Sequence, residues 1–194
     1  MPVTRRKLTT LAPSPVAGGA PVPYLGDADY EEVLRSLVHQ RNALERSPLL
    51  VADMNEERVR DVLLVGLNAA FEGRAAGEVF NGTGKTDLLV READRNIFIG
   101  ECKFWRGPKT ITDTLDQLLS YLTWRDTKAA LLLFIRGQNK TDVIEKALAR
   151  FKEHPGFRAA VGGDIDGERY NFRFAAAGDP QQSVRLAFLP FLLT

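Results

Sequence analysis

The sequence has very little cysteine and histidine. Its 194 residues include one cysteine, Cys102, and two histidines, His39 and His154, which lie far apart in the chain. One cysteine cannot form an internal disulfide, and a zinc site built from cysteine and histidine needs more such ligands. We therefore expect a fold stabilised by an ordinary hydrophobic core, in a reducing, cytoplasmic setting.

The sequence also lacks long hydrophobic runs and a strong excess of one charge. No run approaches the roughly 20 apolar residues that a membrane helix needs, and prolines interrupt the N-terminal stretch where a signal peptide would need a continuous apolar core. These absences predict a protein that does not associate with membranes. The formal net charge of +1 is too small to identify a nucleic-acid-binding protein by itself.

The length favours one domain with a modest extension. The proline-rich residues 1–25 are typical of a tail or linker, which could join the chain to a further domain, a partner or a second copy. Residues 26–54 are expected to form an accessory helix, over 27–46, and a connection. The main domain is predicted over residues 55–194.

Apolar spacing and turn residues predict an alternation of helices and strands in the main domain. The continuous apolarity of residues 129–135 indicates a buried strand with parallel neighbours. This order predicts an α/β sandwich around a mixed central sheet. The expected elements are a helix from about Asn55 to Phe71, a meander of strands 77–80, 85–91 and 96–104, a helix over 112–124, the strand 129–135, a helix over 141–152 capped by Thr141, and late strands 170–175 and 183–191.

The most informative segment runs from Lys85 to Lys103. The turn formers of residues 92–96 predict a hairpin that brings Asp87 near Glu101. Side chains alternate along a strand, so Glu101 and Lys103 should point one way and Cys102 the other. Two carboxylates and an ammonium group should therefore converge.

This set of groups suits the hydrolysis of a phosphodiester bond. Carboxylates are oxygen ligands that Mg²⁺ prefers, and the backbone carbonyl of Cys102 is a candidate third ligand; Mn²⁺ is the alternative ion. A bound cation neutralises the charge that develops on the phosphate. Lys103 would hold the water or the phosphate, and burial and a neighbouring cation would lower its pKa.

Asp87, thirteen intervening residues and then Glu101-Cys-Lys103 resemble the PD-(D/E)XK nuclease superfamily. The resemblance implies a restriction-endonuclease-like three-layer sandwich with the core order helix, three strands, helix, strand. It implies that Asp87 and Glu101 bind the metal, that Lys103 is catalytic and that an acid on the first core helix completes the site. Glu56 is the preferred candidate for that acid, and Glu57 is the alternative.

Two shorter likenesses add candidates. Gln117-Leu-Leu-Ser-Tyr121 is similar to the Gln-x-x-x-Tyr element of RecB-type members, and its four-residue spacing places both side chains on one helix face. That likeness implies contact with the nucleic-acid backbone or with the lysine. Residues 77–81, 84–87 and 101–105 also resemble uncharacterised bacterial proteins of restriction or defence type, which makes Glu78 a further candidate near the metal. Thr86 stands where the motif name has proline.

The expected function is therefore a Mg²⁺-dependent deoxyribonuclease, with RNA as the other substrate. The rival function is a catalytically silent module that keeps the fold and binds nucleic acid or a protein partner. A phosphate-loop NTPase is excluded, because the glycine that such a loop needs five residues before Gly84 is Val79.

Several nearby residues can also be explained by an ordinary structural role. Phe104 and Trp105 could stack on a base but more often belong to a core, and Cys102 is better explained as a small buried residue than as a nucleophile. The basic residues Lys103, Arg106 and Lys109 could bind phosphates or form a solvated face.

Overall fold

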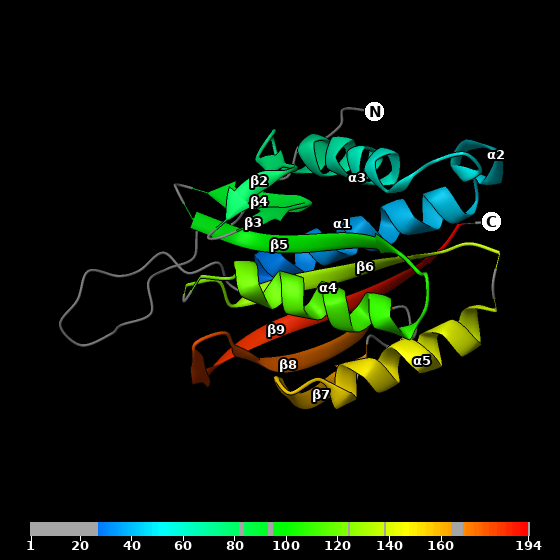
Figure 1. Ribbon diagram of the computed structural model, residues 1–194. Coiled ribbons are helices and arrows are strands. Elements are labelled where there is room, and N and C mark those ends of the chain that lie inside the picture. Colours follow the sequence, from blue (N-terminus) through cyan, green and yellow to red (C-terminus); the bar gives the residue numbers. More distant parts are fainter. Residues whose placement is uncertain are drawn as a thin grey trace.

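The computed structural model describes residues 27–81, 84–92, 95–123, 125–137, 139–163 and 169–193. These residues form a mixed seven-stranded sheet with helices on both faces, and a small two-stranded sheet beside it (Figure 1). The expected tail, residues 1–25, lies outside this part of the chain. No helix within the described ranges is long and apolar enough to cross a membrane.

The elements alternate along the chain much as expected. The helices are α1 (Asp27–Glu45), α2 (Pro48–Val51), α3 (Glu56–Ala70), α4 (Pro108–Tyr121) and α5 (Lys140–Glu153). The strands are β1 (Ala75–Ala76), β2 (Val79–Asn81), β3 (Gly84–Thr86), β4 (Leu88–Glu92), β5 (Arg95–Phe104), β6 (Lys128–Ile135), β7 (Phe157–Gly163), β8 (Tyr170–Ala176) and β9 (Asp179–Leu192).

The large sheet has the strand order β1-β4-β5-β6-β9-β8-β7. Its three central strands β5, β6 and β9 are parallel, and the outer pairs are antiparallel. All eight residues of β6 are buried, which confirms the prediction of a buried strand with parallel neighbours. Such a strand needs helices on both faces, because the crossovers between parallel strands pass over the sheet.

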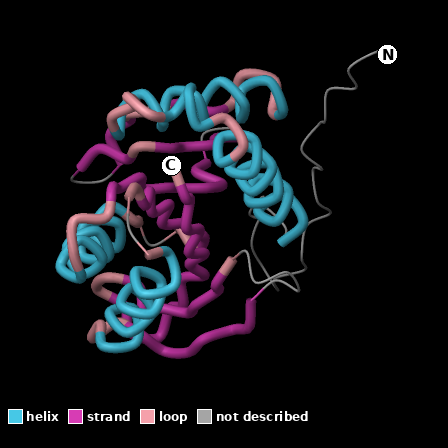
Figure 2. Tube along the Cα trace, turned by 90° about the vertical axis from the view of Figure 1, so that its right-hand side faces the viewer, coloured by secondary structure: helices cyan, strands magenta, loops and turns pink. Residues whose placement is uncertain are grey.

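Two hydrophobic cores lie on the two faces of the sheet. One joins α1 and α3 to the sheet and includes Tyr30, Leu63 and Phe98. The other lies under α4 and α5 and includes Leu115 and Phe151. Figure 2 shows the sheet edge-on between these helices. The helix expected over 27–46 is therefore packed in the same core as the first helix of the main domain.

The strand expected over 85–91 is interrupted at Asp87. β3 ends at Thr86 and pairs with β2, whereas β4 begins at Leu88 and pairs with β1 and β5. The Asp87 side chain accepts a hydrogen bond from a backbone N–H of β5, a competing interaction that favours a break in the ladder. The strand expected over 77–80 begins only at Val79, because Glu78 adopts a left-handed backbone with φ 50° between β1 and β2.

Helix boundaries differ from the prediction where capping residues were misjudged. The helix expected over 112–124 begins at Pro108, because Gly107, with φ 133°, turns the chain and proline suits the first helical position. α5 is capped by Asn139, whose side chain accepts from two backbone N–H groups, and not by Thr141. β7 and α2 were not expected. The hairpin of β4 and β5 is confirmed, although positions 93–94 of its turn lie outside the described residues.

Candidate functional site

The candidate site lies on an open edge of β5. β4 pairs with β5 no further than Leu88 opposite Gly100, so residues 101–104 of β5 pair only with β6 among the described strands. Two carboxylates take the place of the missing strand. The N–H of Cys102 donates to Asp87 Oδ2 at 2.9 Å, and the N–H of Phe104 donates to Glu56 Oε2 at 3.0 Å. The carbonyl of Cys102 shares this edge, because N–H and C=O of one residue in a strand point to the same side.

Glu101 is a buried acid in this arrangement. Its side chain is on the α4 face, in register with Leu131 of β6, and the residue is only 1% exposed. Oε2 accepts a long hydrogen bond from Gln117 Nε2 at 3.4 Å, whereas Oε1 is buried and no donor among the described residues reaches it. Burial first, and then the charge of Asp87, raise the pKa of Glu101 from 4.5 to about 9. The carboxyl group therefore carries a proton at neutral pH unless a cation replaces it.

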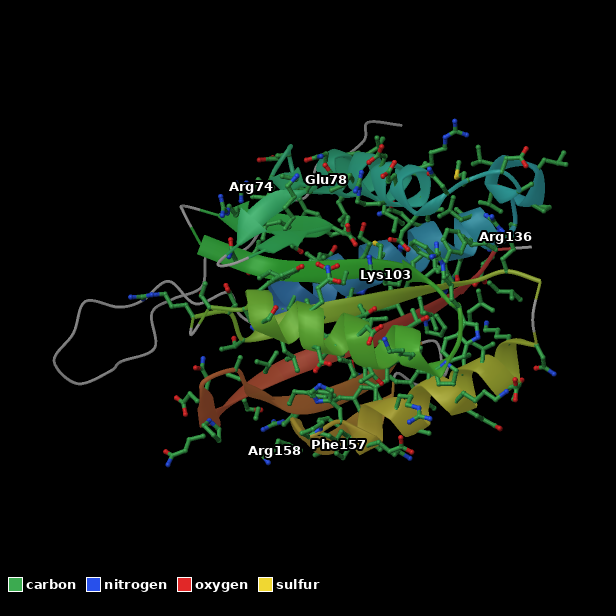
Figure 3. All side chains as sticks on the ribbon, viewed as in Figure 1. Arg74, Glu78, Lys103, Arg136, Phe157 and Arg158 are labelled. Atoms are coloured by element: carbon green, nitrogen blue, oxygen red, sulfur yellow. The ribbon has the colours of Figure 1, made fainter. Side chains whose placement is uncertain are left out.

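Lys103 links the acids of the site. Its Nζ donates to Glu56 Oε1 at 3.0 Å and lies 4.0 Å from Asp87 Oδ2. Figure 3 labels Lys103 beside β5. Burial acts to lower the pKa of Lys103, as expected from the sequence, but the hydrogen bond that Lys103 donates to Glu56 and the negative charges around it outweigh this effect. The net pKa shift of Lys103 is upward. The group is thus an ammonium donor in this state of the protein.

Arg60 forms a second cationic contact, which was not predicted from the sequence. It follows Glu56 by four residues on α3, so both side chains share one helix face. Arg60 Nη1 lies 2.9 Å from Glu78 Oε1 and 3.8 Å from Asp87 Oδ1. The four-residue spacing from Glu56 was the available signal. Glu78 is therefore connected to Asp87 through Arg60. Glu57, by contrast, is exposed on α3.

Gln117 and Thr86 support the site through contacts with residues of β5. Gln117 contacts Glu101, and not the lysine, while Tyr121 is half-buried one turn later on α4. Thr86, the residue before Asp87, is fully buried, and its hydroxyl lies 3.1 Å from the carbonyl oxygen of Gly100. This hydroxyl ties the bend that carries Asp87 to the residue that precedes Glu101.

The oxygen atoms of Asp87, Glu101 and the Cys102 carbonyl are ligands of the kind that a divalent cation such as Mg²⁺ prefers. Two carboxylates that approach each other in a buried site repel unless they share a proton or a cation, and Oε1 of Glu101 is without a donor beside Asp87. Glu56 is engaged by Lys103 and Phe104. Within the described ranges, no three His, Cys, Asp or Glu side chains are grouped closely enough to hold a metal by themselves. Mg²⁺ retains several waters and needs few protein ligands, so two carboxylates and a carbonyl are a sufficient set.

For Cys102, Phe104 and Trp105 the sequence allowed either a functional or a structural role, and their surroundings are mostly those of structural residues. Cys102 is fully buried, and burial raises the pKa of its thiol well above the usual range. Phe104 packs against Phe134, and Trp105 is 8% exposed in the core under α4. Trp105 is thus a core residue, and Phe104 is a partly buried residue packed against the core.

The remaining basic residues of this region and the two histidines lie apart from Asp87 and Glu101. Arg106 and Lys109 are exposed near the start of α4. His39 is exposed on α1, and His154 pairs with Asp116 at 3.1 Å.

No protein-family model matches this chain, and no similar curated protein or solved structure was found. The function is therefore inferred from the geometry of the site.

Proposed function

We propose that this chain is a divalent-cation-dependent nuclease that hydrolyses phosphodiester bonds, with DNA as the expected substrate. The observation that carries the proposal is the electrostatic interaction of Asp87 with the buried Glu101, with the Lys103 ammonium group 4.0 Å from Asp87, on an open strand edge. The mixed sheet between two helical layers, and the order α3, β1, β4, β5, α4, β6 of the elements that flank or form it, support a restriction-endonuclease-like sandwich. A role in bacterial restriction or defence is part of the same proposal and rests on the sequence resemblance.

Asp87 and Glu101 would hold Mg²⁺ or Mn²⁺, with the Cys102 carbonyl as a third ligand. When bound, the ion would neutralise charge on the phosphate and lower the pKa of a water molecule. Binding would require Glu101 to release its proton, because only the carboxylate is a good ligand. Gln117 would orient the Glu101 carboxylate through the hydrogen bond that it already donates.

Lys103 would act as a donor and not as a base. Its raised pKa keeps three N–H groups available, of which one is directed to Glu56. A phosphate oxygen that approaches Asp87 and Glu101 could accept another of them, which stabilises the negative charge that develops there. Glu56 would keep the lysine side chain in place, and Arg60 would do the same for Asp87.

One observation favours the rival function, a silent module that binds nucleic acid or a protein. Asp87 and Glu56 already satisfy two backbone N–H groups of β5. That role stabilises the fold without any catalysis, so the acids could be retained in a protein that cleaves nothing.

The test is cleavage of supercoiled, linear and single-stranded DNA, and of RNA, with Mg²⁺, Mn²⁺ or EDTA. Asp87→Asn keeps an oxygen that can accept from the Cys102 N–H, and Lys103→Met keeps the length of the side chain. We expect each change to reduce metal-dependent cleavage at least about 100-fold. The matched control is Lys146→Met, at an exposed lysine of α5, which should cleave like the unchanged protein. No cleavage of any substrate, with DNA binding unchanged in both site variants, would favour the silent module.

A further inference from the structure

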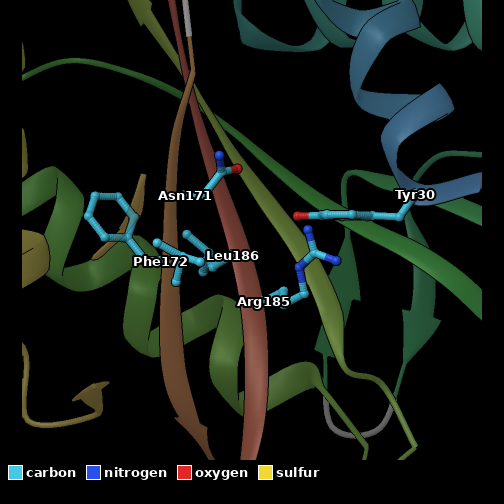
Figure 4. Close-up of a pocket in the computed structure, with 6 residues that line it drawn as sticks. Tyr30, Asn171, Phe172, Arg185 and Leu186 are labelled. Atoms are coloured by element: carbon cyan, nitrogen blue, oxygen red, sulfur yellow. The ribbon is translucent and has the colours of Figure 1, made fainter. Parts of the chain in front are cut away.

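Two arginines next to α1 pair directly with an acid. Arg185, which lines the pocket in Figure 4, lies 3.1 Å from Oε1 of Glu31, and Arg169 lies 2.7 Å from Oε2 of the same acid. Arg60, beside the candidate site, differs from them. Its Nη1 lies 3.8 Å from Asp87 Oδ1, beyond the distance of a hydrogen bond, although the Asp87 side chain is only 19% exposed. A guanidinium group this close to a mostly buried carboxylate ordinarily pairs with it, so another contact must hold Arg60 back.

Two exposed acids hold the guanidinium group of Arg60. Its Nε and Nη2 donate to Asp61 Oδ1 at 3.2 and 3.1 Å, and its Nη1 donates to Glu78 Oε1 at 2.9 Å. The side chains of Asp61 and Glu78 are 62% and 54% exposed, so water weakens both ion pairs. A direct pair with Asp87 would be less exposed and therefore stronger. The position of Arg60 thus depends on where Glu78 places its carboxylate.

The turn that carries Glu78 is packed against Asp87 and α3. β1 pairs with β4 and β2 pairs with β3, so the two residues between β1 and β2 lie beside the break between β3 and β4 at Asp87. The first is Gly77, where a Cβ would lie 3.1 Å from the Asp87 carbonyl oxygen and 2.5 Å from Leu64 Cδ1 of α3. The second is Glu78, whose left-handed φ of 50° is uncommon for a residue other than glycine. Strain of this kind persists where the surrounding structure enforces it, and it is frequent at functional sites.

The two carboxylate oxygens of Asp87 have different surroundings. Oδ2 accepts from the Cys102 N–H at 2.9 Å and lies 4.0 Å from Lys103 Nζ, whereas Oδ1 is the oxygen on the Arg60 side. A direct pair with Arg60 would engage Oδ1 with an internal cation, which a metal ion would then have to displace. An arginine that is held at 3.8 Å avoids this competition.

We propose that Glu78 and Asp61 form a clamp that keeps Arg60 from pairing with Asp87, and so preserves Oδ1 of Asp87 as a ligand for a divalent cation. Glu78 is then a positioning residue that acts through Arg60, and it is not a metal ligand itself. The clamp also accounts for a glutamate at a left-handed position where glycine or asparagine would be less strained. The proposal rests on the proposed function for the cation, whereas the clamp itself needs no cation to operate.

The test is Mn²⁺ binding by calorimetry, in about 0.15 M salt to screen exposed charges, for a double-mutant cycle of Glu78→Asn and Arg60→Met. Asparagine suits a left-handed backbone but is shorter and neutral, so the released guanidinium group should pair with Asp87. We expect Glu78→Asn alone to weaken Mn²⁺ binding at least about fivefold. When Arg60→Met is also present, Glu78→Asn should change the affinity less than about twofold, because no cation is released. The matched control is Glu145→Asn, at an exposed residue of α5, which should bind Mn²⁺ like the unchanged protein.

Two results of this cycle would overturn the clamp. Unchanged Mn²⁺ binding in Glu78→Asn would show that Arg60 is not held by Glu78, and equal weakening with and without Arg60→Met would make Glu78 a metal ligand.

A second cycle, made in EDTA, tests the clamp without a metal. It measures the coupling between Arg60→Met and Asp87→Asn as a factor in the unfolding equilibrium constant, and this factor should rise at least about threefold in the presence of Glu78→Asn. If the unchanged protein binds no Mn²⁺, the metal site and the proposed nuclease are rejected, and the EDTA cycle alone decides on the clamp. Equal coupling with and without Glu78→Asn would overturn it.

Discussion

The neighbouring strands β5 and β6 carry opposite chemistry at equivalent positions. Glu101 and Lys103 of β5 are in register with Leu131 and Leu133 of β6 and face the same helical layer. β6 has β5 and β9 as hydrogen-bonded neighbours along its length, whereas β5 has no β4 partner beyond Gly100. The candidate site thus arises where the ladder stops, because unpaired N–H groups at an edge need acceptors and carboxylates can supply them.

The difference also explains why an acid is tolerated at one position and not at the other. Glu101 has Gln117, Lys103 and Asp87 near it and can take a proton or a cation. Leu131 lies in a strand whose eight residues are all buried, among aliphatic and aromatic side chains. A carboxylate there would lose its hydration with nothing to replace it.

The largest effect should come from placing an acid on β6, at the position in register with Glu101. Leu131→Glu places a carboxyl group in the apolar core and should destabilise the fold by more than about 4 kcal/mol. Urea denaturation followed by circular dichroism measures this change. Leu131→Met, which nearly preserves volume, should cost less than about 1.5 kcal/mol. A well-folded Leu131→Glu protein would show that β6 tolerates a buried acid as β5 does, which would contradict the proposed difference between the two strands.

The next effect is the pH dependence caused by Glu101. Because its pKa is about 9 in the folded protein against 4.5 ordinarily, the folded state keeps a proton that the unfolded chain releases. Its contribution to stability is fully present below about pH 4.5 and is lost as the pH rises toward about 9. Glu101→Gln should remove this slope and be more stable by about 1–3 kcal/mol near pH 8.

The measurement is the free energy of unfolding of both proteins between pH 5 and 9. Mn²⁺ should stabilise the unchanged protein, increasingly with pH, because the cation displaces the proton of Glu101. Glu101→Gln should lose most of that stabilisation. Identical pH slopes in the two proteins would contradict the assignment of a buried, protonated acid.

The sequence predicted the contrast between these strands better than it predicted the edge. The alternation of side chains correctly placed Glu101 and Lys103 on one face and Cys102 on the other. The apolar run of β6 correctly predicted a strand that is buried on both faces. These features depend on the period of a strand, which is local. The break at Asp87 and the left-handed Glu78 depend on side-chain contacts with distant elements, and no local pattern contains them.

The same limit applies to the partners of the site residues. The choice of Glu56 over Glu57 agrees with the observed contact to Lys103, but the capture of the Phe104 N–H was not foreseen. Gln117 was expected to contact the lysine or the nucleic acid, and the protein side chain to which it donates a hydrogen bond is that of Glu101. Which face of β5 lies under α4 is decided by packing over the whole sheet, so spacing within one helix could not give it.

A smaller effect should separate two adjacent acids of α3. Glu56→Gln weakens the contacts to Lys103 Nζ and the Phe104 N–H, and should cost about 1–2 kcal/mol of stability. Glu57→Gln changes the same charge at an exposed position of the same helix turn and should change stability by less than about 0.5 kcal/mol. Thermal unfolding of the two variants side by side gives the comparison. Equal losses would mean that helix-terminal charge, and not the β5 edge, accounts for the effect.

The smallest effect concerns the hydroxyl that fixes the end of the ladder. Thr86 Oγ1 lies 3.1 Å from the Gly100 carbonyl oxygen and 3.3 Å from that of Leu88, at the last pair between β4 and β5. Thr86→Val keeps the shape and loses the donor, so it should cost about 1 kcal/mol, whereas Thr86→Ser should recover most of this. If the hydroxyl also sets the separation of Asp87 and Glu101, Thr86→Val should weaken Mn²⁺ binding, measured by calorimetry, and Thr86→Ser should restore it. Unchanged Mn²⁺ affinity in Thr86→Val would limit the hydroxyl to a role in stability, and the two carboxylates would then be held by their contacts with the edge of β5 alone.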